Sequence, residues 1–573
     1  MAWIRSIVLS TLVTYVAAIW PLPTSQSLGT LVLFIDENVQ FNYQAAGNQT
    51  GGGGYGRQTA RPDIVSTAID DTTDTIFERG FYPWRFRQRN TDFDPASNSS
   101  TTTIRTINLV QNTTEPDSIT NAKLGHVDES YTLTVTDAGE VTITAATSIG
   151  ISYGLNTFTQ LFYLTRDSRP YTPLAPVSIS DSPKFPHRGM NLDVARSYYS
   201  PAAIIRQINA LAYNKMNRLH LHITDSQSWP LEVPALPRLT ETGAYSPDFV
   251  YTPSILREIQ QYGADRGVQV YLEIDMPGHT GIVELAYPGL TVAWNVRPNW
   301  DTYALQPPSG SLKLASPQVD QFLDHLFADV LPRVNEFSGY WHFGGDEVLP
   351  SQYALEEAVN STDRAVIRPF MQRFMDAQHD RIRARGLTPV VWEEMLLEWN
   401  LTIGNDVLVQ AWKGSDSILG AVQSGKRAIA GDYNNWYLDC GHGQWLDFRP
   451  ESAAGFYPFN DYCSPRKNWR QIYAFDPLSN IPANLTSLVI GGEVHLWGEQ
   501  ADEIDVDRKV WPRAAAAAEV LWSGARDEQG RNRSQVEASP RLAEMRERLV
   551  ARGVMAEPVH MPFCTQNGTQ CAL

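Results

Sequence analysis

The segment "YWHFGGDEV" (residues 340–348) begins with a mainly apolar stretch, which is followed by two glycines and two adjacent carboxylates, Asp346 and Glu347. A short apolar run that ends in polar residues is typical of a strand in a parallel sheet, whose carboxyl end faces an active site. Adjacent acids repel each other, so the fold itself gains little from them, although a solvated turn would also explain one isolated pair. The rest of the chain decides between these interpretations.

Seven further segments after residue 186 repeat this pattern, and helical patterns such as "PAAIIRQINALAYNK" and "SILREIQQYGADRG" lie between most of them. The eight segments begin at His187, Met216, Val268, Tyr340, Thr388, Asp406, Arg427 and Leu488. Eight strand–helix units predict a (β/α)8 barrel, an α/β fold, over residues 181–550, with its active site at the carboxyl ends of the strands. The helical pattern is weak after the sixth and seventh strands, so irregular units are expected there.

A smaller α+β domain is predicted before the barrel, over residues 101–180. The segments "TIRTINLV", "ESYTLTVT" and "EVTITAA" alternate and are rich in Thr, Val and Ile, which favours strands, and "SIGISYGLNTFTQLFYL" has helical spacing. Residues 19–100 contain a glycine-rich loop and a basic cluster, Arg85, Arg87 and Arg89, and are expected to be a propeptide or N-terminal segment cut at that cluster. Residues 551–573 are expected to form a C-terminal tail.

The N-terminus predicts secretion. Residues 1–18 combine Arg5, an apolar run and two small residues, Ala17 and Ala18, as in a signal peptide. Eight sequons follow, at Asn48, Asn98, Asn112, Asn360, Asn400, Asn484, Asn532 and Asn567. Together they predict a glycosylated extracellular or cell wall-associated protein. No membrane span is expected, because the apolar run is short and no later stretch is long enough.

Charge and cysteine content limit the partners. The net charge of −17 makes nucleic acid and anionic membrane surfaces poor partners. The four cysteines allow three pairings, of which Cys440–Cys463 and Cys564–Cys571 join nearest neighbours and are favoured. No metal and no cofactor are expected, since the chain has neither a Cys-x-x-Cys motif nor a matching His pair.

Polar and aromatic residues end all eight predicted strands. A lone His or Trp at such a place is usually part of a core, but eight strands that all end this way favour a functional site. The residues are Arg188, His222 with Asp225, Asp275 with His279, Asp346 with Glu347, Trp392, Trp412, Tyr437 with Asp439, and Trp497 with Glu499. The 16 Trp and 24 Tyr of the chain also suit a sugar-binding cleft, because aromatic faces stack on pyranose rings.

Carboxylates beside aromatic residues indicate glycoside hydrolysis. The usual retaining design places two carboxylates on opposite sides of the bond, but side chains of sequence neighbours diverge. Asp346 and Glu347 are therefore poorly suited to act as nucleophile and opposed acid. A 2-acetamido sugar brings its own nucleophile, since its carbonyl oxygen can attack the anomeric carbon and form an oxazolinium ion. One carboxyl group would then protonate the leaving oxygen while the other holds the acetamido nitrogen. Gly344 and Gly345 are expected to allow close backbone approach beneath the sugar.

The motifs "HRGMNLDVAR", "HLHITDSQSWP", "EIDMPGH", "HFGGDEV", "WYLDCG" and "LWGE", with "DESYTLTV" and "GLNTFTQL" before them, resemble those of the β-N-acetylhexosaminidases of glycoside hydrolase family 20, most closely the extracellular fungal members. The resemblance extends from about residue 125 to about residue 525. It implies an exo-acting, retaining enzyme that removes terminal GlcNAc or GalNAc from chitooligosaccharides or other glycans. "TDSQ" departs from the two consecutive acids of many animal members, but it keeps the first acid, Asp225.

The resemblance also implies a role for each residue. Glu347 would be the general acid/base, tuned by a relay of Asp225 and His279, and Asp346 would orient and stabilise the acetamido group. The substrate-binding residues would be Tyr437 on the acetamido oxygen, Trp392, Trp412 and Trp497 as walls, and Arg188, Asp439 and Glu499 on the hydroxyls. A homodimer and an association with the cleaved propeptide stay open as protein partners.

Three other functions remain open as alternatives. A chitinase-type barrel would need an Asp-x-x-Asp-x-Asp-x-Glu run, which the chain lacks. An exo-glycosidase with its own nucleophile would have to use Asp439 or Glu499. A non-catalytic sugar-binding protein on the same fold would not need Glu347 and the residues that support it.

Overall fold

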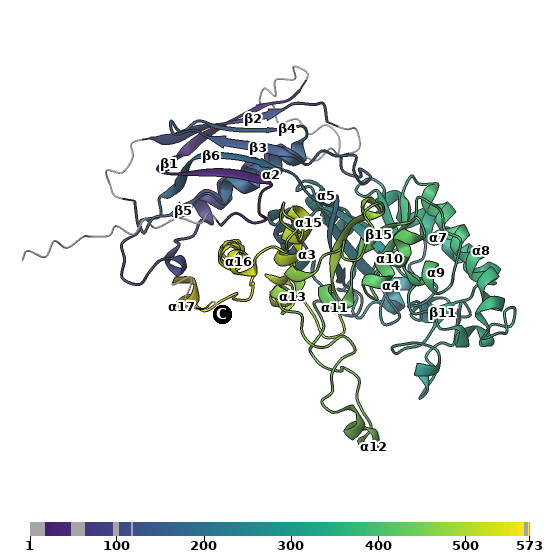
Figure 1. The fold of residues 1–573 in the computed structure, drawn as a ribbon. Helices are drawn as coiled ribbons and strands as arrows, with labels where there is room; N and C mark the ends of the chain where they lie inside the picture. The colour runs from purple at the N-terminus through teal and green to yellow at the C-terminus, as the bar shows by residue number, and fades with distance from the viewer. Residues whose placement is uncertain (1–17, 47–62, 96–101, 116–118, 567–570, 572–573) are drawn as a thin grey trace, which may run out of the picture.

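The computed structural model describes residues 18–46, 63–95, 102–115, 119–566 and 571. The chain forms an N-terminal sheet with helices packed on it and, beside it, a closed barrel (Figure 1). Residues 1–17 of the predicted signal peptide and the sequons at Asn48, Asn98 and Asn567 lie outside the described residues. The other five sequon asparagines, Asn112, Asn360, Asn400, Asn484 and Asn532, are all exposed.

The N-terminal sheet has six strands in the order β1-β2-β4-β3-β6-β5. Their bounds are β1 Ser25–Gln44, β2 Thr103–Gln111, β3 Tyr131–Val135, β4 Val141–Ala145, β5 Tyr163–Leu164 and β6 Pro170–Asp181. Alternate residues of β3 and β4 are buried, as their sequence pattern predicts. The helix α2 (Ser148–Thr159) packs on this face, and α1 (Ile64–Thr73) packs against α2.

The beginning of this domain differs from the prediction. The strand β1 pairs in parallel with β2 and antiparallel with β6, so the domain includes residues well before 101. Residues 19–100 are therefore not a segment separate from it. The sequence concealed this strand because most of its residues are exposed or half-buried and its register shifts at several points, so no clean alternation marks it.

The predicted barrel is confirmed. Eight strands close in the order β12-β13-β14-β15-β16-β7-β8-β9, and every neighbouring pair is parallel. Their bounds are β7 His187–Asp193, β8 Arg218–Thr224, β9 Gln269–Ile274, β12 Tyr340–His342, β13 Thr388–Trp392, β14 Leu408–Ala411, β15 Arg427–Ala430 and β16 Val489–Leu496. Nearly all strand residues are buried, because the helices cover the barrel from outside.

Helices surround the barrel. The longer ones are α3 Pro201–Tyr213, α5 Pro253–Ala264, α7 Pro317–Val334, α8 Arg364–Arg383, α10 Ser415–Gln423, α15 Arg513–Ser523 and α16 Gln535–Ala551. The shorter elements are α4 Arg238–Gly243, α6 Val283–Ala286, β10 Thr291–Val292, β11 Ser311–Leu312, α9 Glu394–Leu397, α11 Tyr433–Trp436, α12 Pro450–Ala453, α13 Trp469–Ala474, α14 Val506–Val510 and α17 Pro562–Gln566. Ser200 caps α3 and Thr252 caps α5, each followed by a proline at the first helical position.

The seventh unit of the barrel is irregular, as predicted, whereas the sixth contains the regular helix α10. After α11 the chain leaves the barrel in a long excursion that carries α12 far from the strands (Figure 1). Cys440 and Cys463 form a disulfide at the base of this excursion, and Cys564 pairs with Cys571, as the sequence favours. Among the helices that the structure describes, none has both the length and the apolar character needed to cross a membrane.

Candidate active site

A pocket lies at the carboxyl ends of the barrel strands. Its lining residues come from the loops that follow these strands, as the barrel topology requires. They are Arg196, His279, Gln306, Asp346, Glu347, Trp392, Trp412, Tyr437, Tyr462, Trp497 and Glu499. Most of the predicted site residues are thus brought together, while Asp225 and Asp439 lie behind this lining.

The loop after β12 turns sharply to present the two acids. Gly344, Gly345 and Glu347 all have positive φ, at 71°, 103° and 54°, a conformation that only glycine adopts readily. A Cβ on Gly344 would lie 1.7 Å from Oδ1 of Asp275, and one on Gly345 would lie 2.6 Å from Met395. The space that the glycines leave is therefore filled by protein side chains, which corrects the expectation that it serves a sugar.

His279 connects Glu347 to Asp225. Its Nδ1 is 3.1 Å from Oδ2 of Asp225, and its Nε2 is 3.4 Å from Oε2 of Glu347. Burial lowers the pKa of His279, but the negative charges of Asp225 and Asp346 outweigh burial and hold the pKa well above its usual value. His279 is therefore an imidazolium at neutral pH, with a proton on the nitrogen that faces Glu347.

Asp225 is a buried anion. Burial raises its pKa, but Arg196 and His279 lower it further, so the pKa lies well below its usual range. Nη2 of Arg196 is 2.7 Å from Oδ2 of Asp225, and Nε2 of His222 is 2.9 Å from the same oxygen. These contacts fix the carboxylate that in turn fixes His279.

Asp346 lies beside a second buried acid, Asp275, which directly follows β9. Oδ1 of Asp275 accepts a hydrogen bond of 2.6 Å from the backbone N–H of Gly345. Burial and the charge of Asp346 hold the pKa of Asp275 well above its usual range. Asp275 therefore carries a proton when Asp346 is ionised, which allows two close acids to coexist.

The aromatic walls are fixed by buried carboxylates. Nε1 of Trp392 donates a hydrogen bond of 2.7 Å to Oε1 of Glu273, and Nε1 of Trp412 lies 3.1 Å from Oε2 of Glu394. The rings of Trp412 and Tyr437 are nearly parallel, at an interplanar angle of 13° and a centroid distance of 6.1 Å. The side chain of Tyr437 is buried, with its ring beside those of Trp412 and Trp497.

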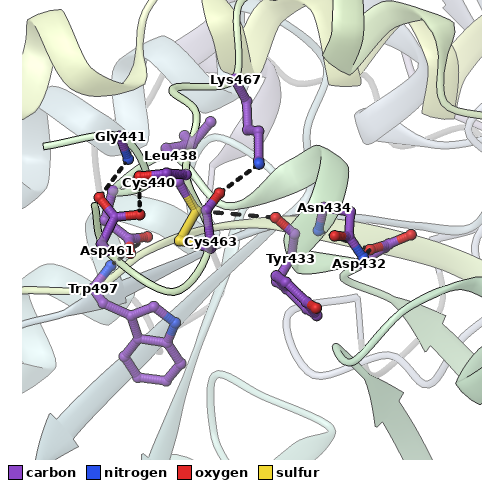
Figure 2. The surroundings of a disulfide bond; sticks show 12 residues. Asp432, Tyr433, Asn434, Leu438, Cys440, Gly441, Asp461, Cys463, Lys467 and Trp497 are labelled. Atoms are coloured by element: carbon purple, nitrogen blue, oxygen red, sulfur yellow. Dashed lines mark hydrogen bonds between the residues drawn. A yellow bond between two sulfur atoms is a disulfide. The ribbon is translucent and has the colours of Figure 1, made fainter. Parts of the chain in front are cut away.

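The disulfide Cys440–Cys463 belongs to one buried cluster with Tyr437, and Trp497 packs against this cluster. Figure 2 shows the disulfide and the ring of Trp497. Asp461 accepts a hydrogen bond of 2.7 Å from the N–H of Gly441, which closes the base of the loop further. The residues next to the two cysteines belong to the site. Asp439 accepts a bond of 3.4 Å from the N–H of Trp497, and Tyr462 lines the pocket.

Asp439 and Glu499 form a second pair of close acids. Burial and the charge of Glu499 raise the pKa of Asp439 to about 8. Asp439 is therefore largely protonated at neutral pH, and it can donate a hydrogen bond as well as accept one.

Residues 185–525 match the family model described as "Glycosyl hydrolase family 20, catalytic domain", and residues 19–161 match the model "beta-acetyl hexosaminidase like". The chain belongs to glycosyl hydrolase family 20. The second match begins before β1, which agrees with the place of this strand in the N-terminal sheet.

Relatives of this family 20 chain match it over most of its length. A beta-hexosaminidase of Arthroderma benhamiae is 41% identical, over 97% of this chain and 98% of that protein. A chitooligosaccharidolytic beta-N-acetylglucosaminidase of Ostrinia furnacalis is 34% identical, over 78% of this chain and 75% of that protein. A solved structure of a GH20 exo beta-N-acetylglucosaminidase from Vibrio harveyi in complex with N-acetylglucosamine has the same fold, with a TM-score of 0.72, 22% identity, and coverage of 95% of this chain and 79% of that one.

The prediction that Arg188 of this family 20 chain binds sugar hydroxyls is wrong. Arg188 lies at the amino end of β7, opposite the pocket, and is fully buried. Its guanidinium donates hydrogen bonds of 2.7 and 3.1 Å to Glu129 of the N-terminal domain. Arg196, which follows the carboxyl end of the same strand, lines the pocket instead. The rule that places barrel sites at carboxyl strand ends selects Arg196 from the same motif.

Two other pocket residues were missed. Tyr462 carries one usable signal, its position next to Cys463 in the predicted loop. Gln306 lies on a long connection between β9 and β12 where no periodicity marks it. Asp275 was recognised at a strand end but received no role.

Some side chains could in principle hold a metal ion. In the described part of the chain, ligand atoms within 4.8 Å of one another occur in three groups: His220, Glu273 and His342; Asp439, Cys440 and Cys463; Asp275, His279 and Asp346. The cysteines are already joined in a disulfide, and Nδ1 of His342 accepts the N–H of Gly344. The expectation that the site needs no metal remains a prediction.

Proposed function

We propose that the chain is an exo-acting, retaining β-N-acetylhexosaminidase that removes terminal non-reducing GlcNAc or GalNAc from chitooligosaccharides or other glycans. The observation that carries this proposal is the division of labour between two adjacent acids. The imidazolium of His279 lies 3.4 Å from Glu347 and 3.8 Å from Asp346, whereas the buried, protonated Asp275 interacts with Asp346. Such a pair, held in a pocket of Trp and Tyr side chains, suits a substrate that supplies its own nucleophile.

In the first step, the acetamido carbonyl oxygen of the substrate attacks the anomeric carbon. The bond to the leaving oxygen breaks, and that oxygen takes the proton of Glu347. Asp346 accepts the acetamido N–H and balances the positive charge that develops on the oxazolinium ring. The hydroxyl of Tyr437 donates to the acetamido oxygen and orients it for attack.

In the second step, water attacks the same carbon and gives a proton to the carboxylate of Glu347. The oxazolinium ring opens and the acetamido group is restored. Because the anomeric carbon is inverted twice, its configuration is retained. The His279–Asp225 contact holds Glu347 in place for both proton transfers.

The sugar hydroxyls are assigned to Arg196, Glu499 and Asp439. Arg196 and Glu499 line the pocket, and Asp439 lies directly behind it. Asp439 is the weaker candidate for an enzyme nucleophile, since a carboxyl group whose pKa is about 8 is mostly neutral at the pH of the reaction. This argues against Asp439 as the nucleophile of such an exo-glycosidase and leaves Glu499 for the substrate comparison below to test.

We also propose that the protein is secreted and glycosylated. The apolar N-terminus and the exposure of all five described sequon asparagines support this. If the chain is cut at Arg85–Arg89, β1 stays bound through its pairing with β2 and β6. This pairing is how a cleaved propeptide would remain associated with the protein. A homodimer remains a proposal.

A pair of chromogenic substrates tests the proposed activity. The chain should hydrolyse an aryl N-acetyl-β-glucosaminide and leave the matching plain β-glucoside intact, because the glucoside has no acetamido nucleophile. Comparable rates on both would favour an enzyme nucleophile, and no hydrolysis of either would favour a sugar-binding protein. A galactosaminide added to the panel measures the GlcNAc-to-GalNAc preference.

A further inference from the structure

The interior of the barrel below the pocket contains a buried glutamate, Glu273, on β9. Each of its two carboxylate oxygens accepts a hydrogen bond from a residue that leads to the pocket, and each also faces a buried histidine: Nε2 of His220 lies 3.0 Å from Oε2, and Nδ1 of His342 lies 3.3 Å from Oε1. Oε2 accepts from Nδ1 of His222 at 2.8 Å, and Oε1 accepts from Nε1 of Trp392 at 2.7 Å. The side chain of Glu273 is fully buried and does not line the pocket.

The first of these bonds supports the proton relay. The other nitrogen of His222, Nε2, lies 2.9 Å from Oδ2 of Asp225, so the imidazole is held between two carboxylates. Burial lowers the pKa of His222, but the charge of Glu273 and the bond to Asp225 raise it to about 10. His222 is thus a cation that donates to both acids, and it ties Glu273 to the carboxylate that positions His279.

The second bond supports the aromatic wall. Trp392 is almost fully buried, and its indole lines the pocket beside the two adjacent acids. An indole has only one donor and no acceptor, so the bond to Glu273 is the only polar restraint on the ring. A change at Glu273 would therefore remove one polar restraint from the relay and one from the wall, while Arg196 still binds Asp225 and His342 and Trp497 still pack against Trp392.

We propose that Glu273 is a positioning residue, which rests on the proposed function: its carboxylate holds the His222–Asp225–His279 relay and the Trp392 wall in one geometry without touching the sugar. The chemistry requires a carboxylate, because both partners are donors and an ionised carboxylate only accepts. A glutamine can accept through one oxygen alone, and its amide NH2 would oppose either the His222 N–H or the Trp392 N–H. Glu273→Gln thus replaces one oxygen by an NH2 group and disrupts the bond to either His222 or Trp392, while the volume of the side chain is kept.

The barrel interior also offers a matched control, Glu493 on β16. Glu493 is equally buried and accepts bonds from His187 at 2.7 Å, Tyr271 at 2.5 Å, Gln410 at 3.0 Å and His220 at 3.2 Å. None of these four partners lines the pocket, although the other nitrogen of His220 lies 3.0 Å from Glu273. Glu493→Gln therefore disturbs a buried carboxylate of the same barrel without releasing a pocket residue.

The experiment compares Glu273→Gln, Glu493→Gln and wild type in the full-length protein. Kinetics are measured on two aryl N-acetyl-β-glucosaminides, one with a good and one with a poor leaving group, and stability is measured by urea unfolding. Glu273→Gln should lower kcat by roughly 10- to 100-fold, more for the poor leaving group, and raise KM. Glu493→Gln should change kcat by less than about threefold, even where it lowers stability by a similar amount. Equal kinetic losses in the two variants would overturn the proposal.

A double variant tests the relay arm. If Glu273 acts through Asp225, adding Asp225→Asn to Glu273→Gln should cost much less than the product of the two single losses. Fully multiplicative losses would overturn this arm. If Glu273→Gln does not fold, Glu273→Asp and Glu493→Asp give the same comparison, since each shortens the side chain by one methylene and keeps the charge. A wild-type protein that is inactive on both substrates would instead reject the proposed function itself.

Discussion

Asp346 and Glu347 are adjacent in the chain, but the left-handed conformation of Glu347 sends their side chains into different surroundings. Asp346 lies beside a second acid, and Glu347 lies beside a cationic histidine. The same loop therefore gives one carboxyl group a charge-balancing task and the other a proton-transfer task. Backbone conformations of this kind are unfavourable by about 1–3 kcal/mol and persist where the surrounding structure enforces them. Just before Glu347, Asp275 and Met395 fill the space beside Gly344 and Gly345, so no side chain fits at either glycine.

Glu347→Gln tests the general acid. The amide cannot donate a proton to the leaving oxygen, so kcat should fall by roughly 10²–10⁴. An activated aryl leaving group, which needs less protonation, should lose less than a poor one. Losses of the same size for both leaving groups, measured with the purified variant, would contradict the assignment.

Asp346→Asn tests the charge-balancing acid. The variant should fold, since Asn keeps the shape of the side chain, but kcat should fall by roughly 10²–10³ because the oxazolinium loses its counter-charge. A thiazoline mimic of the intermediate should also bind more weakly. Inhibition titrations with unchanged thiazoline affinity would show that Asp346 has another task.

The pH profile tests His279. The kcat/KM profile should be bell-shaped with an optimum on the acidic side of neutral, and its alkaline limb should report the general acid. The pKa of His279 is raised above its unfolded value, so the imidazolium and its stabilising contacts are complete below about pH 6.5 and are lost as pH rises through the folded pKa. His279→Ala removes this cation beside Glu347, so the alkaline limb should move to higher pH, and by more than the acid limb. A wild-type optimum above pH 8, or a variant that shifts neither limb, would contradict these roles.

At the scale of elements, the sequence predicted the strands and helices that belong to the repeated strand–helix units of the barrel. All eight barrel strands and the helices α3, α5 and α8 follow from apolar periodicity, because each unit buries the same kind of face. It did not predict β1, whose exposed residues carry no periodicity. For the excursion after β15 it predicted an irregular unit and the disulfide, but not the path of the chain, which no periodic pattern marks. Arg188 and Arg196 belong to one sequence motif, but they lie near opposite ends of β7. The direction of this strand therefore decides that Arg188 contacts the N-terminal domain and that Arg196 lines the pocket.

The loop after β15 leads to a prediction about the disulfide Cys440–Cys463. The bond closes a loop with a sequence separation of 23 and holds Asp439 and Tyr462 at the pocket. Opening it should weaken this loop by about 3 kcal/mol of closure entropy. The barrel has its own core, so mild reduction should lower activity at a concentration of reductant that leaves the far-ultraviolet circular dichroism unchanged. Peptide mapping without reduction should recover Cys440 linked to Cys463, and a Cys440–Cys564 link would refute the pairing.

At the scale of the whole molecule, the N-terminal domain and the barrel are joined by buried charges. Lys215 of the barrel lies 2.9 Å from Asp181 of β6, with both side chains fully buried. Nε1 of Trp522 donates to the same carboxylate at 2.9 Å. Arg188 adds the bonds to Glu129. Breaking a buried pair leaves an uncompensated charge, so this interface resists separation of the two domains.

The last prediction concerns Arg188, which lies at this domain interface and not at the sugar site that the sequence motif had suggested. Arg188→Met should lower the free energy of unfolding by about 3–5 kcal/mol, because Glu129, whose side chain is only 10% exposed, loses its partner. KM for the aryl N-acetyl-β-glucosaminide should stay within about twofold, since Arg188 does not reach the pocket. Arg196→Met is the matched control: it removes a pocket arginine that also contacts Asp225, so it should reduce kcat/KM strongly. Urea unfolding and steady-state kinetics on both variants measure the two effects separately. A large rise in KM for Arg188→Met with unchanged stability would return Arg188 to the sugar site and contradict its place at the domain interface.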